Sequence, residues 1–240
     1  MPKLHRFRNL ACLLFCFLAV APAKAQNSET APSTIRVTFK RAAVASFLVG
    51  KRQPQLDQAE DMTLSCPLVQ ICIDDPDILP HAGRTLTRLA DDQLRGRFGQ
   101  QVIQRSDVQK AEDELKLNKE VDTPRLMAER LGKILNVDAV MIGTVWRYRD
   151  RGTVNGMPDS PASVAFAIYL VEAATGRVLW RGLFDETQQA LFDNVLNAKK
   201  NLKMGLKWLS ANELAEYGVR EVFNKFPTNV LPGDFSGEQK

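Results

Sequence analysis

The sequence predicts an α/β fold, a three-layer sandwich in which a mixed sheet is covered by helices on both faces. Three strand candidates follow one another closely, over residues 140–148, 164–171 and 177–187. The middle candidate is apolar at every position, so we expect other elements to cover both of its faces. Helical patterns before and after these strands supply the covering layers, and the strands themselves predict an antiparallel meander over residues 140–188.

Alternation along the middle strand assigns its side chains to two faces of the sheet. One face carries Val164, Phe166, Ile168 and Leu170, and the other carries Ala165, Ala167, Tyr169 and Val171. In the first strand, one face carries Val140, Ile142 and Trp146. A short turn over residues 173–176 joins the last two strands, and Gly176 supplies the positive φ that such a turn needs.

The chain before the meander supplies a strand and a long helix. Residues 41–50 form a nearly continuous apolar run, which predicts one buried strand. Residues 64–73 stay ambiguous because a proline interrupts them. An apolar stripe at helical spacing predicts a helix over residues 79–98, and residues 101–103 are a short strand candidate. The order of these elements favours crossover connections ahead of the meander.

Three more helices are predicted from the residues at their ends. Residues 106–117 open with the spacing of a capping box (SDVQ). Thr123 and Pro124 are typical of an N-cap and a first helical position, and Asn136 ends the helix that they open. Ser210 begins a second capping box and with it the last helix of the chain.

The first 25 residues have the pattern of a cleavable signal peptide. A basic start precedes an apolar run over residues 10–21, which is short for a membrane span. Ala23 and Ala25 are the small residues of a cleavage site, so we expect cleavage after Ala25 and export to the periplasm. An uncleaved membrane anchor is the alternative, which these small residues disfavour. Neither Cys12 nor Cys16 has the setting of a lipid-anchored cysteine.

The charge of the processed chain argues against nucleic acid as a partner. The whole chain has 32 Lys and Arg against 28 Asp and Glu, a formal charge of +4. The signal peptide holds no acid and four of the bases, which are Lys3, Arg6, Arg8 and Lys24. After cleavage the two signs balance, whereas a nucleic-acid-binding domain usually has a basic excess.

Composition divides the processed chain into three parts. Residues 26–39 are polar and without periodicity, which predicts a flexible leader. Residues 40–228 carry all the strand and helix patterns and are long enough for a single α/β domain. Residues 229–240 are again polar and predict a loose tail.

Two stretches of the meander resemble motifs of a group of bacterial envelope proteins. Residues 136–145 (NVDAVMIGTV) are similar to their "DAV-x-x-G-x-V" strand entry. Residues 170–180 (LVEAATGRVLW) are similar to their "D-x-x-TG-x-x-x-W" turn. The group includes the curli-secretion channel subunit (CsgG-type), LpoB-type activators of penicillin-binding proteins and the amino-terminal domain of TolB. The resemblance implies an α/β sandwich that works in the periplasm through protein contacts. Residues 150–160 form only a polar loop, so no membrane-inserting hairpin is indicated.

Cys66 and Cys72 are the only cysteines of the processed chain, and in an oxidising periplasm they are candidates for a disulfide. Six residues in a straight strand or helix hold two cysteines too far apart to bond, so the bridge needs a turn near Pro67. Two buried free thiols are the alternative. A metal site would add His81, the one histidine left after cleavage, but the spacing matches no standard pattern.

Catalytic motifs are missing from the sequence. It has no G-x-S-x-G elbow for a nucleophile, no phosphate-binding P-loop and no G-x-G-x-x-G turn for a dinucleotide. We therefore expect no enzyme activity and no cofactor.

Two basic segments are candidates for interaction. Arg147, Tyr148, Arg149 and Arg151 lie near the open end of the meander, where they either meet a partner or simply discourage strand pairing. A second segment interleaves large apolar residues with Lys199, Lys200, Lys203 and Lys207. It is typical of a solvated helix face, and peripheral contact with an anionic membrane is the alternative.

We therefore expect a non-enzymatic periplasmic binding or scaffold protein of the cell envelope, acting in assembly or secretion through protein contacts. Other envelope proteins are the expected partners, and self-association or association with the outer membrane would fit the same role. The alternative is a periplasmic metal-binding or redox protein built on Cys66, Cys72 and His81.

Overall fold

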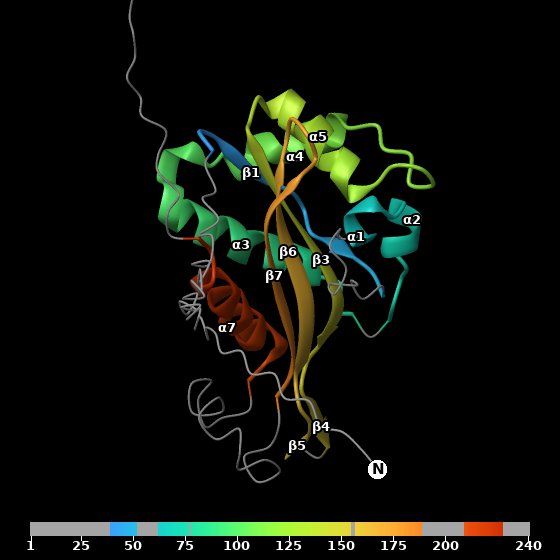
Figure 1. Cartoon of the computed structure of the whole chain (residues 1–240). Helices are drawn as coiled ribbons and strands as arrows, with labels where there is room; N and C mark the ends of the chain where they lie inside the picture. The colour runs from blue at the N-terminus through green and yellow to red at the C-terminus, as the bar shows by residue number, and fades with distance from the viewer. Residues whose placement is uncertain (1–38, 52–61, 77, 155–156, 189–208, 228–240) are drawn as a thin grey trace, which may run out of the picture. The chain divides into compact units, whose positions relative to one another are not determined.

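The computed structural model describes residues 39–51, 62–76, 78–154, 157–188 and 209–227 (Figure 1). All described residues belong to one compact unit, which spans residues 35–240. The predicted signal peptide, most of the predicted leader and the predicted tail therefore lie outside the described residues.

A mixed sheet of five strands forms the centre of this unit, in the order β1-β3-β6-β7, with β2 also paired to β3. The strands are β1 (Ala42–Val44), β2 (Leu48–Val49), β3 (Ala139–Arg149), β6 (Ser163–Glu172) and β7 (Val178–Thr187). Both β1 and β2 run parallel to β3, whereas β3, β6 and β7 form an antiparallel meander. The predicted meander and the crossover ahead of it are thus confirmed.

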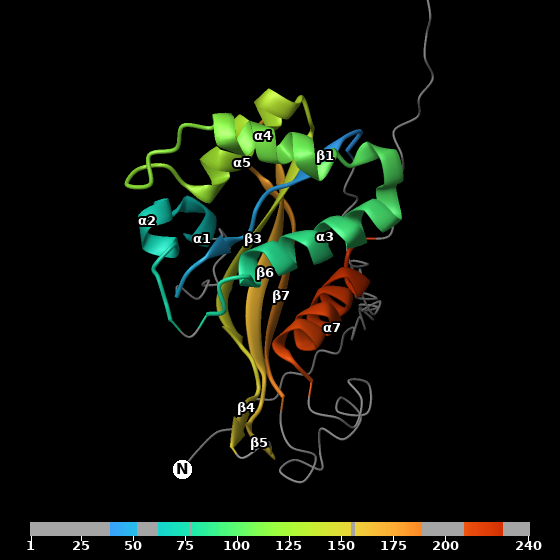
Figure 2. The same cartoon turned by 180° about the vertical axis from the view of Figure 1, so that it is seen from behind.

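Helices cover both faces of the sheet. They are α1 (Met62–Ser65), α2 (Leu68–Ile71), α3 (Ala82–Phe98), α4 (Arg105–Glu114), α5 (Pro124–Leu135) and α7 (Ala211–Asn224). Figure 1 shows α7 to the left of the strands and α1 and α2 to their right, and Figure 2 shows α3 and α7 side by side. The molecule is a three-layer sandwich, as the sequence predicts.

The two faces of β6 pack into two separate hydrophobic cores. Val164, Phe166, Ile168 and Leu170 join the core beneath α3 and α7. Ala165, Ala167, Tyr169 and Val171 join the core beneath α4 and α5. All eight side chains are fully buried, so the predicted assignment of this strand to two covered faces is confirmed.

Four of the predicted helix and turn signals are confirmed in atomic detail. The Thr123 hydroxyl accepts a hydrogen bond from Leu126 N at 3.2 Å, and Asn136 ends α5 in the left-handed conformation with φ 51°. Ser210 and Glu213 form a complete capping box at the start of α7. Gly176 has φ 69° in the turn between β6 and β7.

Three predicted elements before the meander differ from the structure. Residues 41–50 form two short strands instead of one, because the backbone between them bonds to side chains of α3 and α4. Gln104, not Ser106, is the N-cap residue of α4. In place of a strand over 101–103 there is a 3₁₀ turn (Gly99–Gln101) and one bridge from Val102 to Ala42.

The predicted loop over residues 150–160 is also different. It forms a two-stranded hairpin of β4 (Gly152–Val154) and β5 (Met157–Ser160), because the polar chain pairs with itself in an antiparallel register. The ambiguous residues 64–73 become the one-turn helices α1 and α2, separated at Pro67.

Candidate functional site

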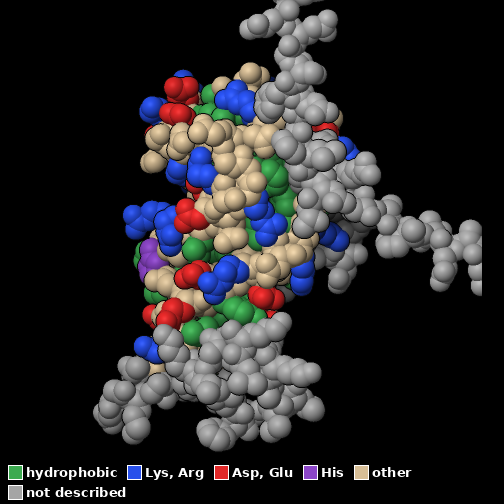
Figure 3. Space-filling view, turned by 90° about the vertical axis from the view of Figure 1, so that its left-hand side faces the viewer, with side chains coloured by type: hydrophobic (Ala, Val, Ile, Leu, Met, Phe, Trp, Pro, Cys, Tyr) green, Lys and Arg blue, Asp and Glu red, His purple; other side chains and the backbone are tan. Residues whose placement is uncertain are grey.

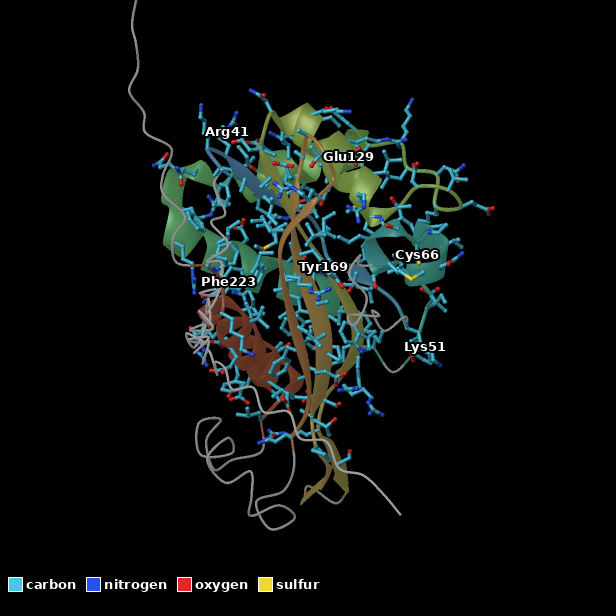
Figure 4. All side chains as sticks on the ribbon, viewed as in Figure 1. Arg41, Lys51, Cys66, Glu129, Tyr169 and Phe223 are labelled. Atoms are coloured by element: carbon cyan, nitrogen blue, oxygen red, sulfur yellow. The ribbon has the colours of Figure 1, made fainter. Side chains whose placement is uncertain are left out.

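The two cysteines flank α2 and carry free thiols. Cys66 is buried and Cys72 is half-buried, and Figure 4 shows Cys66 on the other side of the sheet from Phe223 of α7. Pro67 separates α1 from α2 with an extended backbone, at φ −54° and ψ 143°. The disulfide between Cys66 and Cys72 stays a prediction.

The Cys72 thiol is poorly suited to redox chemistry as it stands. Burial raises its pKa, Lys119 opposes that shift, and Asp74 adds to it. A raised pKa leaves little thiolate at neutral pH, and the thiolate is the reactive form. A reactive-thiol role at this position therefore has no electrostatic support.

His81 lies where three elements meet, at the N-cap of α3. Its ring packs edge-on against Tyr148 of β3 at 5.8 Å between centroids, and its Nε2 lies 3.2 Å from Asn212 Oδ1 of α7. Throughout the described ranges, no three His, Cys, Asp or Glu residues gather closely enough to hold a metal ion. His81 thus belongs to a structural junction and not to a cluster with the cysteines.

The four interaction candidates at the end of β3 separate into core and surface. Tyr148 is fully buried and donates to Asn212 Oδ1 at 2.6 Å, so its side chain does not present itself to a partner. The Arg147 guanidinium forms an ion pair with Asp185 of β7. Arg149 and Arg151 are exposed. The second segment, with Lys199, Lys200, Lys203 and Lys207, lies outside the described residues, and its role stays a prediction.

A polar clasp that the sequence did not reveal closes the β1 edge of the sheet. Arg105 donates to Val44 O at 2.8 Å and to Glu112 Oε2 at 2.8 Å. Glu112 in turn accepts from both the backbone N and the hydroxyl of Ser46, and Thr87 Oγ1 accepts from Phe47 N at 3.0 Å. Three of these contacts, Arg105 to Val44, Ser46 to Glu112 and Phe47 to Thr87, join residues 61, 66 and 40 positions apart, and no local sequence pattern indicates partners at such distances.

An open cleft of about 470 Å³ lies beside this clasp, between the β1–β2 connection and α3. Ser46, Thr87 and Arg105 line it, but they already bond to one another or to nearby backbone. Asp91, which also lines the cleft, is paired with Arg95. The arrangement stabilises the sheet edge, because these polar groups that line the cleft are engaged in such contacts.

Large apolar side chains are exposed mainly around α1 and α2. Six such residues are exposed by more than 40% in the described part of the chain, and four of them lie here: Met62, Val69, Ile73 and Val121. The loop that carries Val121 is bound to α2 by two backbone hydrogen bonds. Leu68 N donates to Asp122 O, and Val69 N donates to Lys119 O, each at 2.8 Å. We call these four side chains the α1–α2 patch.

Charged residues neighbour the members of this patch. Lys119 and Glu120 are exposed next to Val121, and Lys51 pairs with Asp75 near Ile73. Figure 3 shows the side of the molecule that carries α7, where basic and acidic side chains intermingle and hydrophobic ones are scattered. Of the helices in the described ranges, none combines the length and the apolar character that crossing a membrane requires.

Comparison with known proteins shows likeness to solved structures. No protein-family model matches the chain, and no curated protein matches it. A PelC dodecamer structure from Paraburkholderia phytofirmans is 14% identical, covers 80% of this chain and 89% of its own, and has a TM-score of 0.42. The lipoprotein GNA1162 from Neisseria meningitidis is 16% identical, covers 68% of this chain and 91% of its own, and has a TM-score of 0.39.

The E. coli LpoB structure is 11% identical, with 78% and 85% of the two chains covered and a TM-score of 0.35. The LpoB-type resemblance seen in the sequence thus recurs among the structures, while the resemblance to CsgG and TolB stays a prediction. At these identities and TM-scores the likeness carries no functional argument, so the function must be argued from this chain's own residues.

Proposed function

We propose that this chain is a non-enzymatic periplasmic protein of the cell envelope that binds another envelope protein through the α1–α2 patch. The observation that carries the proposal is that four of the six exposed large apolar side chains among the described residues lie on or beside α1 and α2, or on the loop that bonds to α2. Exposed apolar groups on a monomer surface gain most from contact with a protein partner, because binding removes them from water. The periplasmic address rests on the predicted signal peptide.

The construction of the patch supports a rigid docking surface. Two backbone hydrogen bonds fix the Val121 loop to α2, and Leu64 and Leu68 anchor the two short helices with side chains that are almost fully buried. Apolar centres with charged rims are typical of protein interfaces, and Lys119, Glu120 and Lys51 form such a rim. Little ordering is therefore required on binding.

The alternative of a metal-binding or redox protein has less support. His81 is engaged with Tyr148 and Asn212, and burial raises the pKa of the Cys72 thiol. The polar groups beside the cleft hold the sheet edge together. The described residues thus favour binding over chemistry.

Site-specific photo-crosslinking in living cells tests this function. A photoreactive amino acid at Val121 should yield an adduct with one defined envelope protein, identified by mass spectrometry in the periplasmic or envelope fraction. Ile134 on α5 is the matched control, since its side chain is 46% exposed against 64% for Val121 but lies outside the patch.

A second variant separates true docking from random collision. Val69→Glu introduces a charge into the patch at an exposed position, so it should abolish the Val121 adduct while leaving the melting temperature unchanged. Equal labelling from Val121 and Ile134, or an adduct that persists in Val69→Glu, would contradict the proposal.

A further inference from the structure

The outer edge of β7 is the open edge of the sheet. Within the described ranges, β7 pairs with β6 on one side and with no strand on the other. It is ten residues long and contains no proline, and its register shift against β6 lies between Val178 and Trp180, outside residues 181–187. Natural edge strands are usually short, bulged or covered, because their free N–H and C=O groups invite pairing with another chain. The β1 edge has such protection in the Arg105–Glu112 clasp, and β7 has no comparable side-chain clasp among the described contacts.

The register of β7 shows which of its backbone groups point outwards. Gln188 N donates to Ala162 O at 3.0 Å, so this pair exchanges hydrogen bonds. Hydrogen-bonded and non-bonded pairs alternate along an antiparallel ladder. The even-numbered residues from 182 to 188 therefore bond to β6. The N–H and C=O groups of Arg181, Leu183 and Asp185 point to the open edge.

The same three residues also present exposed side chains. Leu183 is 44% exposed, and Arg181 and Asp185 are exposed on either side of it, all on one face of the sheet. Asp185 is held by Arg147, which reaches it across Ala165 on β6. The edge thus offers a basic, an apolar and an acidic side chain at alternate positions.

We propose that β7 is a self-association edge that pairs antiparallel with β7 of a second copy of this chain, about a two-fold axis at Leu183. The two copies of Leu183 then face each other on the axis and exchange backbone hydrogen bonds. Arg181 lies opposite Asp185 of the second copy, and this ion pair occurs twice by symmetry. An isologous contact of this kind closes after two subunits.

Charge complementarity favours a second copy of this chain as the partner of β7, and it also favours one register of the pairing. Moving the axis to Arg181 or to Asp185 places like charges opposite each other, which destabilises a strand pair. Moving it to residue 182 or 184 places Leu183 opposite Arg181 or Asp185 and forms no ion pair. The register centred on Leu183 is the one that matches apolar to apolar and positive to negative. This inference does not depend on the α1–α2 patch, which lies on other elements.

Sedimentation velocity of the exported protein, purified from the periplasm, tests the proposal. We expect a concentration-dependent dimer. Arg181→Glu and Asp185→Lys should each raise the dimer dissociation constant by at least about tenfold, because each places like charges opposite one another. Arg149→Glu, at an exposed arginine of β3, is the control and should leave the constant unchanged.

Mixing the two variants gives the decisive result. When the Arg181→Glu protein is mixed with the Asp185→Lys protein, opposite charges face each other at both cross-strand pairs of the mixed dimer. The mixture should therefore dimerise more tightly than either variant does alone. Thermal melting of each variant confirms that it is folded. A monomeric wild-type protein, an oligomer insensitive to both substitutions, or a mixture that stays monomeric would each overturn the proposal.

Discussion

The hydroxyl of Tyr148 is buried where β3, α3 and α7 meet. It donates to Asn212 Oδ1 at 2.6 Å, and its side chain has no exposed surface. Burial raises the pKa of Tyr148 to about 12 from its ordinary value of 10, and a hydrogen bond with Thr85 only partly opposes this. The phenol therefore stays protonated in the folded protein over a range in which an exposed tyrosine ionises.

We expect the free energy of unfolding to fall as the pH rises from about 10 to about 12. The unfolded chain releases the Tyr148 proton near pH 10, whereas the folded chain holds it until about pH 12. Ionisation therefore favours the unfolded state, by up to about 1.4 kcal/mol per pH unit. Urea unfolding at a series of alkaline pH values measures the slope.

Tyr148→Phe is the control for this slope, because it keeps the ring and removes the ionisable group. Its free energy of unfolding should depend less steeply on pH over the same interval. Burial also raises the pKa of Tyr217, which both proteins retain and which cancels in the comparison. Parallel slopes for the two proteins would contradict the role given to Tyr148.

Residues that control local backbone geometry could be predicted, and residues that act over distance could not. Gly176 and Asn136 were predicted because turns and helix ends require positive φ, a local demand that is visible in the sequence. Arg105 bonds to residues 59 and 61 positions away, and no spacing rule indicates such partners. The same limit explains Tyr148, which was predicted as an interaction residue and is held in the core by Asn212.

The two capping-box patterns show how an element's start depends on its surroundings. Both begin with serine and have Glu or Gln three residues later, yet only Ser210 caps a helix. Arg105 is fixed by Val44, Ser46 and Glu112, and these contacts place it inside the first turn of α4. Ser106 is then already helical and has no free turn to cap.

This difference gives a matched pair of substitutions. Ser210→Ala should lower the free energy of unfolding by about 1 kcal/mol, because it removes the hydroxyl that accepts from Glu213 N. Ser106→Ala should change it by less than about 0.5 kcal/mol, as expected for an exposed residue outside such a feature. Urea denaturation of both variants gives the comparison, and equal losses would show that the assignment of the two caps is wrong.

The apolar pattern of β6 alone was enough to predict the three-layer sandwich. Because successive side chains of β6 point to opposite faces and all are apolar, the sequence required a layer on each side, and the two cores confirm it. The α1–α2 patch was not predicted. It combines two one-turn helices with a loop about fifty residues further along the chain, and neither part has a regular period.

The predicted signal peptide leads to a prediction about the processed chain. The sequence has an isoelectric point near 8.9, and four basic residues of the predicted signal peptide account for the entire excess of +4. Cleavage after Ala25 should therefore give a periplasmic protein that begins at Gln26 and has an isoelectric point near neutrality. Intact-mass analysis and isoelectric focusing of the protein from fractionated cells measure both properties. A full-length, basic protein in the membrane fraction would instead indicate an uncleaved anchor, because the apolar run over residues 10–21 would then remain attached.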